Sequence, residues 1–180
     1  IQTTHDAAQS SAVRAINRMQ TMRNWLIGYY IVEFEQHGKD RAEYGAHLLK
    51  KLEERVDRKG LNVTLFQTSR NFYNLYPQMG GLFVQNEIYS TLSNKSGNSI
   101  PLMDKSADAQ SNTNCATVSH NFQTPPEMIV SRLSFSHIRE IMSVDDPLAR
   151  YFYEQECIKC TWSVRELRRQ ISTNLYFRTG

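Results

Sequence analysis

Apolar residues recur at helical spacing along most of this 180-residue sequence, and no segment alternates apolar and polar residues beyond a few positions. Such spacing places one apolar stripe along a helix, whereas a half-buried strand needs strict alternation. The longest stripe predicts one amphipathic helix over about 7–36, ending near His37 and Gly38, with apolar positions at Val13, Ile16, Met19, Leu26, Tyr30 and Phe34. We therefore expect a mainly α fold, a multi-helix domain of about five to seven helices.

Two helices joined by a short turn follow the first. Apolar residues at every fourth position predict a helix over about 41–56, which Asp40 can cap. Gly60 can end this segment with a left-handed residue. Asn62 can cap the next helix, which Pro77 closes. This helix-turn-helix-like pair has two interpretations, a DNA-reading motif and a helical hairpin without DNA contact, because many hairpins of the second kind have the same outline.

The middle of the chain differs in composition. Between about 94 and 123 the residues are mostly Ser, Asn, Thr, Ala and Asp without either periodicity, which predicts a long, irregular, flexible insertion. The stretch 81–92 has enough apolar residues for a short helix or strand. We therefore divide the chain into an N-terminal helical half (1–93), the insertion (94–123) and a C-terminal helical half (124–180) that packs on the first to form one domain.

Capping residues mark the helices of the C-terminal half. Two starts are predicted where a capping residue precedes proline, at Thr124 and Pro125 and at Asp146 and Pro147. The second of these helices should end near Cys160. Ser163 and Glu166 stand in the capping-box relation, in which each side chain satisfies a free amide of the other. A last helix should therefore run from Val164 to Tyr176 or Phe177.

The composition limits the partners and the cellular location that we expect for this chain. Lys and Arg exceed Asp and Glu only by 21 to 18, so net charge alone does not indicate nucleic acid. Three cysteines cannot form a disulfide framework, which predicts a reducing, cytoplasmic location. No apolar run reaches the roughly 18 to 20 residues that cross a bilayer, and we expect no membrane partner. Because the sequence starts at Ile1 and stops without a closing element, we expect a fragment of a longer chain.

The sequence shows no set of residues spaced as a catalytic or metal centre. Cys157 and Cys160 form a CxxC pair, but a structural zinc site needs four ligands, so both are expected to pack on one helix face. Gly80 and Gly81 lack the lysine of a phosphate loop, and the five histidines are scattered. Phosphodiester cleavage needs clustered carboxylates, and no such pattern occurs. We therefore expect no catalytic residue and no cofactor in this chain.

The last helix carries the densest positive charge of the sequence, at Arg165, Arg168 and Arg169, with Arg178 just beyond. The planar guanidinium fork suits phosphate oxygens and guanine edges, so this helix is a candidate DNA contact. A solvated face with local ion pairs is the alternative. Lys50 and Lys51, on the polar face of the helix over 41–56, are further candidates.

Several stretches resemble the N-terminal domain of the YhcG family: LSFSH (133–137), RYFY (150–153) and WSVRELRRQI (162–171), with shorter agreements at Ala15 to Asn17, Ile27 and Gly28, Tyr44 and Gly45, Arg70 to Tyr73, and Tyr76 and Pro77. Members of this family are bacterial proteins in which the helical region precedes a C-terminal PD-(D/E)XK nuclease domain. The resemblance therefore implies the accessory half of a DNA nuclease. It also implies that a divalent metal belongs only to the missing nuclease half.

The resemblance further implies that DNA is the partner and that Arg70 belongs to the binding surface. Two departures from the family pattern matter: Val63 and Thr64 stand where family members tend to be basic, and the insertion over 94–123 is unusually long. The first makes the arginines of the last helix the better candidates for DNA contact. His137 and Trp162 are family-signature residues without a known role. We expect a buried hydrogen-bonding role for His137 and a core role for Trp162.

The sequence thus supports two hypotheses. In the first, this region is the DNA-binding or targeting domain of a two-domain nuclease. In the second, it is a protein-interaction or dimerisation module without nucleic-acid contact, and the aromatic run Tyr29, Tyr30 and Phe34 of the long first helix lies in a subunit seam.

Overall fold

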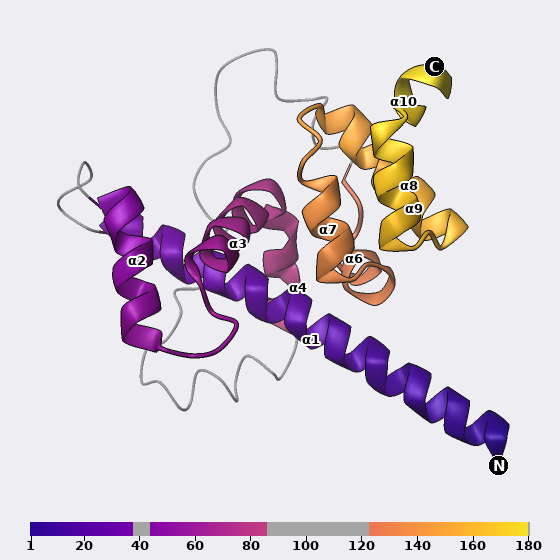
Figure 1. Ribbon diagram of the computed structural model, residues 1–180, viewed down its shortest axis with the longest axis horizontal. Coiled ribbons are helices and arrows are strands. Elements are labelled where there is room, and N and C mark those ends of the chain that lie inside the picture. The colour runs from indigo at the N-terminus through magenta and orange to yellow at the C-terminus, as the bar shows by residue number, and fades with distance from the viewer. Residues whose placement is uncertain (38–43, 86–122, 180) are drawn as a thin grey trace.

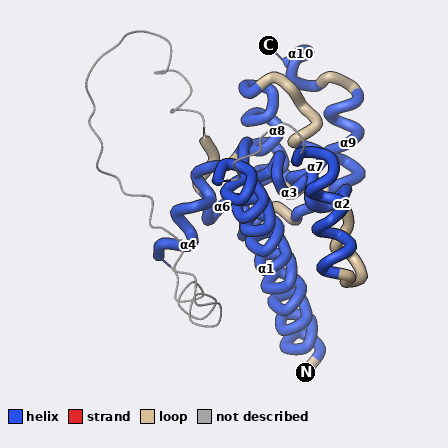
Figure 2. The backbone as a smooth tube through the Cα atoms, turned by 90° about the vertical axis from the view of Figure 1, so that its left-hand side faces the viewer, coloured by secondary structure: helices blue, strands red, loops and turns tan. Residues whose placement is uncertain are grey.

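The computed structural model describes residues 1–37, 44–85 and 123–179, and these ranges are almost entirely helical (Figure 2). They contain nine α-helices, one short 3-10 helix and no strand, which confirms the mainly α prediction. The segment 94–122 of the predicted insertion lies outside the described residues, so its flexibility and the boundaries 1–93, 94–123 and 124–180 stay predictions. No helix in the described ranges is long and apolar enough to cross a membrane.

Helix α1 (Gln2–His37) is the longest described element and begins five residues before the predicted start, while the predicted end at Gly38 lies outside the described residues. Its second half packs along α3 (Val63–Leu75), and this is the most extensive helix pair among the described elements. The two backbones cross at Gly28, where an added Cβ would lie 2.0 Å from the carbonyl oxygen of Ser69. Only glycine permits this approach. The first half of α1 projects away from the other helices (Figure 1).

The main hydrophobic cluster contains residues from both halves of the chain. Trp25 of α1 and Phe72 of α3 lie in it together with Ile138 and Leu167 from the C-terminal helices. Indole Nε1 of Trp25 also donates a hydrogen bond to the carbonyl oxygen of Tyr76, 2.9 Å away. This bond satisfies the only polar atom of a buried tryptophan side chain.

Helix α2 (Tyr44–Val56) and α3 are joined by residues 57–62, in which Asp57 and Gly60 have positive φ. Asn62 caps α3 by accepting a hydrogen bond from the amide of Leu65, as predicted. A second, smaller hydrophobic cluster, made by Ile31, Leu49 and Phe66, fixes α2 against α1 and α3. Two helices joined by a six-residue segment are therefore present, while their assignment as a helix-turn-helix and DNA reading by this pair stay predictions. The 3-10 helix η1 (Pro77–Gly80) and α4 (Gly81–Gln85) follow.

The C-terminal half contains α6 (Pro126–Arg132), α7 (Phe135–Ile141), α8 (Pro147–Cys160), α9 (Val164–Ser172) and α10 (Leu175–Thr179). Asp146 and Ser163 cap α8 and α9 as predicted. The prediction that Thr124 caps a helix was wrong, because its hydroxyl donates to Glu154 instead. A continuous last helix was also wrong: Asn174 adopts a left-handed conformation, with φ of 52°, and separates α9 from α10.

Candidate nucleic-acid interface

Helix α9 presents the predicted arginines on its outer face. Leu167 is completely buried against the main cluster, whereas Arg165, Arg168 and Arg169 are exposed. Ser163 begins the helix by accepting a hydrogen bond from the amide of Glu166. The spacing of the sequence thus predicted the orientation of this helix, and the remaining question is which arginines are free to bind a ligand.

Arg168 is committed to another helix. Its guanidinium binds the carboxylate of Glu140 on α7 in two-pronged geometry, with Nε to Oε2 at 3.1 Å and Nη2 to Oε1 at 2.7 Å. The hydrogen bond from Arg168 lowers the pKa of Glu140 below its usual value. Two-pronged pairs hold a fixed geometry. Arg168 therefore joins α9 to α7, and a phosphate would have to compete with Glu140 for it.

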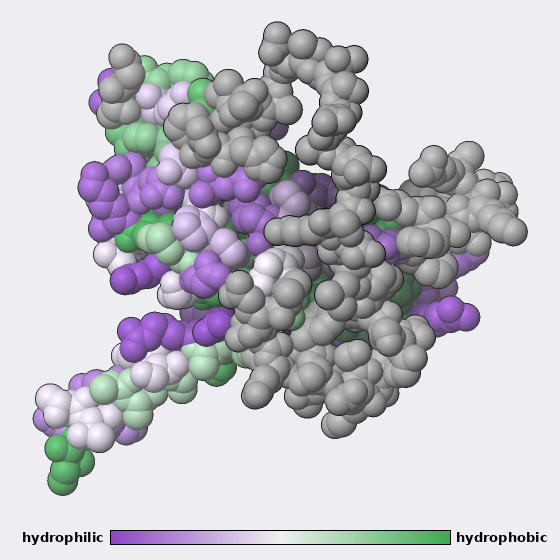
Figure 3. Space-filling view, turned by 180° about the vertical axis from the view of Figure 1, so that it is seen from behind, coloured by the Kyte–Doolittle hydropathy of each residue, from purple (hydrophilic) through white to green (hydrophobic). Residues whose placement is uncertain are grey.

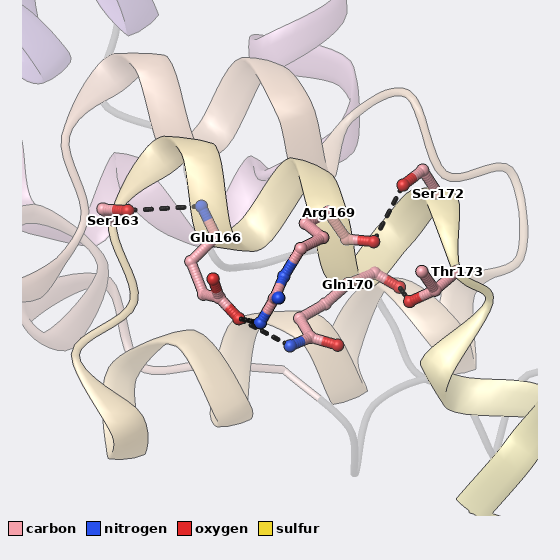
Figure 4. Close-up of polar contacts among 6 residues, drawn as sticks. All are labelled: Ser163, Glu166, Arg169, Gln170, Ser172 and Thr173. Carbon is pink, nitrogen blue, oxygen red and sulfur yellow. Dashed lines mark hydrogen bonds and ion pairs between the residues drawn. The ribbon is translucent and has the colours of Figure 1, made fainter.

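Arg169 is paired within its own helix. Its Nη2 donates to Oε1 of Glu166 at 2.6 Å, and the side-chain amide of Gln170 donates to the same oxygen (Figure 4). The pairing with Arg169 lowers the pKa of Glu166. Glu166 therefore does not complete the predicted capping box, because its carboxylate faces along the helix. Among the three predicted arginines of α9, Arg165 alone has no ion-pair partner in the described ranges.

Arg178 lies on α10 beside an aromatic group. Phe177, with 71% of its surface exposed, contacts the ring of Tyr176, which in turn packs against Phe152 of α8. The side chain of Arg178 is exposed. Arg178 is therefore an exposed cation on the helix that follows the break at Asn174.

A second positive surface lies on α2 and the turn after it. Lys50 and Lys51 are exposed, and so are three further cations that the sequence reasoning did not select as binding residues, Arg55, Arg58 and Lys59. No ion pair joins any of these five to an acidic residue within the described ranges, although Glu54 and Asp57 are exposed nearby. We call these five residues the α2 basic surface. Their density, five cations within ten residues, was readable from the sequence.

The predicted binding residues do not form one continuous surface. In Figure 1, α2 and α9 lie on opposite sides of α3 and α7. Arg70 of α3 is half-buried and has an interaction partner, so it is less available than Lys50 or Lys51. Of the two residues at the start of α3 that depart from the basic family pattern, Val63 packs against the second cluster, whereas Thr64 is exposed.

His137 lies in a hydrogen-bonded site rather than in an open one. Its Nδ1 accepts from the backbone amide of Ser134 at 3.2 Å and from the Ser134 hydroxyl at 2.8 Å, while Nε2 donates to the carbonyl oxygen of Trp162 at 3.0 Å. The carbonyl can only accept, so the proton of the neutral ring is on Nε2. Burial lowers the pKa of His137. His137 thus completes a capping box at the start of α7 and connects that helix to the segment before α9.

A buried carboxylate connects the two halves. Glu154 of α8, with 4% of its surface exposed, accepts hydrogen bonds from the hydroxyls of Tyr76 and Thr124, each at 2.5 Å. Burial raises the pKa of Glu154, and burial together with this carboxylate raises the pKa of Tyr76. Both carboxylate oxygens are satisfied, which a buried charge requires.

The two cysteines of the CxxC pair, Cys157 and Cys160, differ in burial. Cys157 is buried and its thiol lies 3.9 Å from the carbonyl oxygen of Trp162, whereas Cys160 is exposed, so packing explains only the first. Burial raises the pKa of Cys157 to about 11, so this thiol is protonated at neutral pH. No group of three or more His, Cys, Asp or Glu side chains that could hold a metal occurs within the described residues.

Comparisons with known proteins agree with the resemblance seen in the sequence. The DUF1016 N-terminal domain family matches residues 1–178. The chain is also 36% identical over 181 residues to a protein of Escherichia coli (strain K12) named "Putative nuclease YhcG". That match covers 97% of this chain but 43% of the relative, so the chain spans less than half of the relative's length. No solved structure matches the chain.

Proposed function

Since this chain belongs to the DUF1016 N-terminal domain family, we propose that it is the DNA-binding or targeting domain of a longer nuclease. The observation that carries this proposal is the similarity over 97% of the chain to a protein named as a nuclease. The described residues offer positive surfaces, which suits a domain that positions DNA.

The α2 basic surface is the first DNA contact that we propose. Its lysines and arginines are free of ion pairs within the described part of the chain, whereas Arg168 and Arg169 of α9 are paired with carboxylates. A free cation binds phosphate without first losing a partner, and each phosphate contact releases counterions. Arg165 on α9 and Arg178 on α10 are further, separate candidates for DNA contact.

The test is fluorescence anisotropy of labelled duplex DNA against the purified domain at several salt concentrations. Replacing Lys50 and Lys51 with Ala should weaken binding and reduce the slope of log affinity against log salt by about 1.8, because each lost phosphate contact removes about 0.9. Arg168→Ala is the matched control, since its guanidinium is held by Glu140, and it should leave the slope unchanged. An absence of binding even at low salt would contradict the proposal.

The alternative, a dimerisation module, is supported by fewer of the residues that the sequence analysis proposed for it. Tyr29 is already engaged within the domain by ring contacts with Trp25 and Tyr73, and the side chain of Phe34 lies outside the described residues. Tyr30, with 53% of its surface exposed, is the member of the proposed seam that remains available. Light scattering of the purified domain tests this alternative, which requires a dimer.

A further inference from the structure

The first part of α1 projects away from the other helices that the structure describes (Figure 1). Residues 2–20, which we call the α1 arm, are all exposed except for the half-buried Asn17 (Figure 3). At about 1.5 Å per residue the arm is roughly 28 Å long. The first buried side chains of α1 are Thr21 and Met22, so the helix enters the domain only there. A helix of this length that packs against no other described helix is marginally stable in water by itself.

The arm has one acidic residue, Asp6 near its start, and its Arg and Lys charges come from arginines. From Ala7 to Val32 the sequence contains three arginines, Arg14, Arg18 and Arg23, and no acidic residue. Arg14 donates a long hydrogen bond of 3.4 Å to the hydroxyl of Ser11, and Arg18 has no polar partner in the described residues. Both guanidiniums are therefore free to bind an anion.

Arg14 and Arg18 lie on one face of the α1 arm, and the helical period shows which way this basic face points. Residues three or four apart share a face, so Arg14 and Arg18 continue along the line of Met22 and Trp25. Met22 and Trp25 are buried against the rest of the domain. The basic face of the arm is therefore on the same side of α1 as the residues that pack against the rest of the domain. The exposed apolar side chains of Ile16 and Met19 lie on the other side of the arm.

We propose that the α1 arm is a phosphate-binding extension of the DNA surface, in which Arg14 and Arg18 contact the backbone of the duplex that the domain holds. This inference rests on the proposed function. Four residues of helix separate the two guanidiniums by about 6 Å along the axis. A duplex presents one negative charge about every 1.7 Å of its axis, so both arginines can meet phosphates at once. The forked geometry of arginine suits such contacts.

The experiment compares the wild-type domain with two double variants by anisotropy on the same duplex, between about 50 and 200 mM salt. Arg14→Ala with Arg18→Ala should reduce the salt slope by about 1.8, so that the variant loses about 12-fold less affinity over this fourfold range of salt. Arg14→Lys with Arg18→Lys keeps both charges and should keep the wild-type slope. Circular dichroism should show the same fold for all three proteins, because the arm lies outside the buried core.

The outcomes separate the two proposals. A wild-type domain that binds DNA together with an unchanged slope in the alanine variant overturns the arm inference and leaves the proposed function intact. Equal losses of slope in the lysine and alanine variants also overturn it, since the effect would then not follow charge. A wild-type domain that binds no DNA even at low salt overturns the proposed function itself.

Discussion

Gly28→Ala is the substitution for which the structure gives the sharpest expectation. The new Cβ would lie 2.0 Å from the oxygen and 2.6 Å from the carbon of the Ser69 carbonyl, and 2.9 Å from Cβ of Tyr73. These neighbours are backbone atoms or the first atom of a side chain, so no rotamer change relieves the clash. Helices α1 and α3 must therefore move apart by more than 1 Å to restore ordinary contact, which begins at about 3.4 Å.

The expected cost is about 3 kcal/mol. A gap of 0.5 to 1 Å removes a quarter to a half of the attraction between facing atoms. The rings of Trp25 and Tyr29 contact Tyr73 across this crossing. Burying a large side chain contributes about 1.5–3 kcal/mol, and overpacking strain adds about 1–3 kcal/mol. The higher helix propensity of alanine offsets only about 1 kcal/mol of this.

Urea unfolding and thermal melting measure this cost. A loss of about 3 kcal/mol corresponds to a fall in Tm of roughly 6–12 °C for a domain of this size. Gly81→Ala is the matched control, because Gly81 has helical backbone angles and an added Cβ there would meet nothing within 4 Å. The control should change stability by less than about 1 kcal/mol. A Gly28→Ala domain as stable as the control would refute the close crossing of α1 and α3.

The other predictions concern the two buried titratable groups. Burial raises the pKa of Glu154, so its contribution to stability is greatest at low pH and is lost as pH rises through the folded-state pKa. Glu154→Gln should therefore gain stability relative to wild type between about pH 4 and pH 8 in urea unfolding, and a constant difference would contradict this. Burial lowers the pKa of His137, so its contribution is present above the unfolded-state pKa and is lost as pH falls. His137→Gln should cost about 1–3 kcal/mol near pH 8 and less near pH 5, and an equal cost at both would show that the ring does not titrate as described.

The sequence predicts those helix ends that depend only on neighbouring residues. Asn62, Asp146 and Ser163 cap their helices because the amide that each one accepts from lies two or three residues away. Thr124 fails as a cap because its hydroxyl is taken by Glu154, 30 residues further along the chain. The break at Asn174 was readable in principle, since asparagine tolerates the left-handed region better than most residues.

In the candidate site, too, the sequence predicts what depends on neighbouring residues but not what depends on contacts between distant residues. The periodicity of α9 predicts that Arg165, Arg168 and Arg169 are exposed, and all three are. It cannot predict that Arg168 is held by Glu140, which is 28 residues away on another helix. Pairing across helices depends on packing, so the sequence identified the cations but not which of them are free.

The position at which α1 becomes buried, Thr21, also divides this helix into two parts that unfold separately. Beyond Thr21, separating the helix from the domain exposes apolar surface, so that part opens only together with the core. Before Thr21, opening breaks hydrogen bonds of the helix alone and exposes almost no buried surface. The arm can thus fray and re-form while the domain stays folded. The conformational entropy lost when the arm becomes ordered must then be offset by the binding of its ligand.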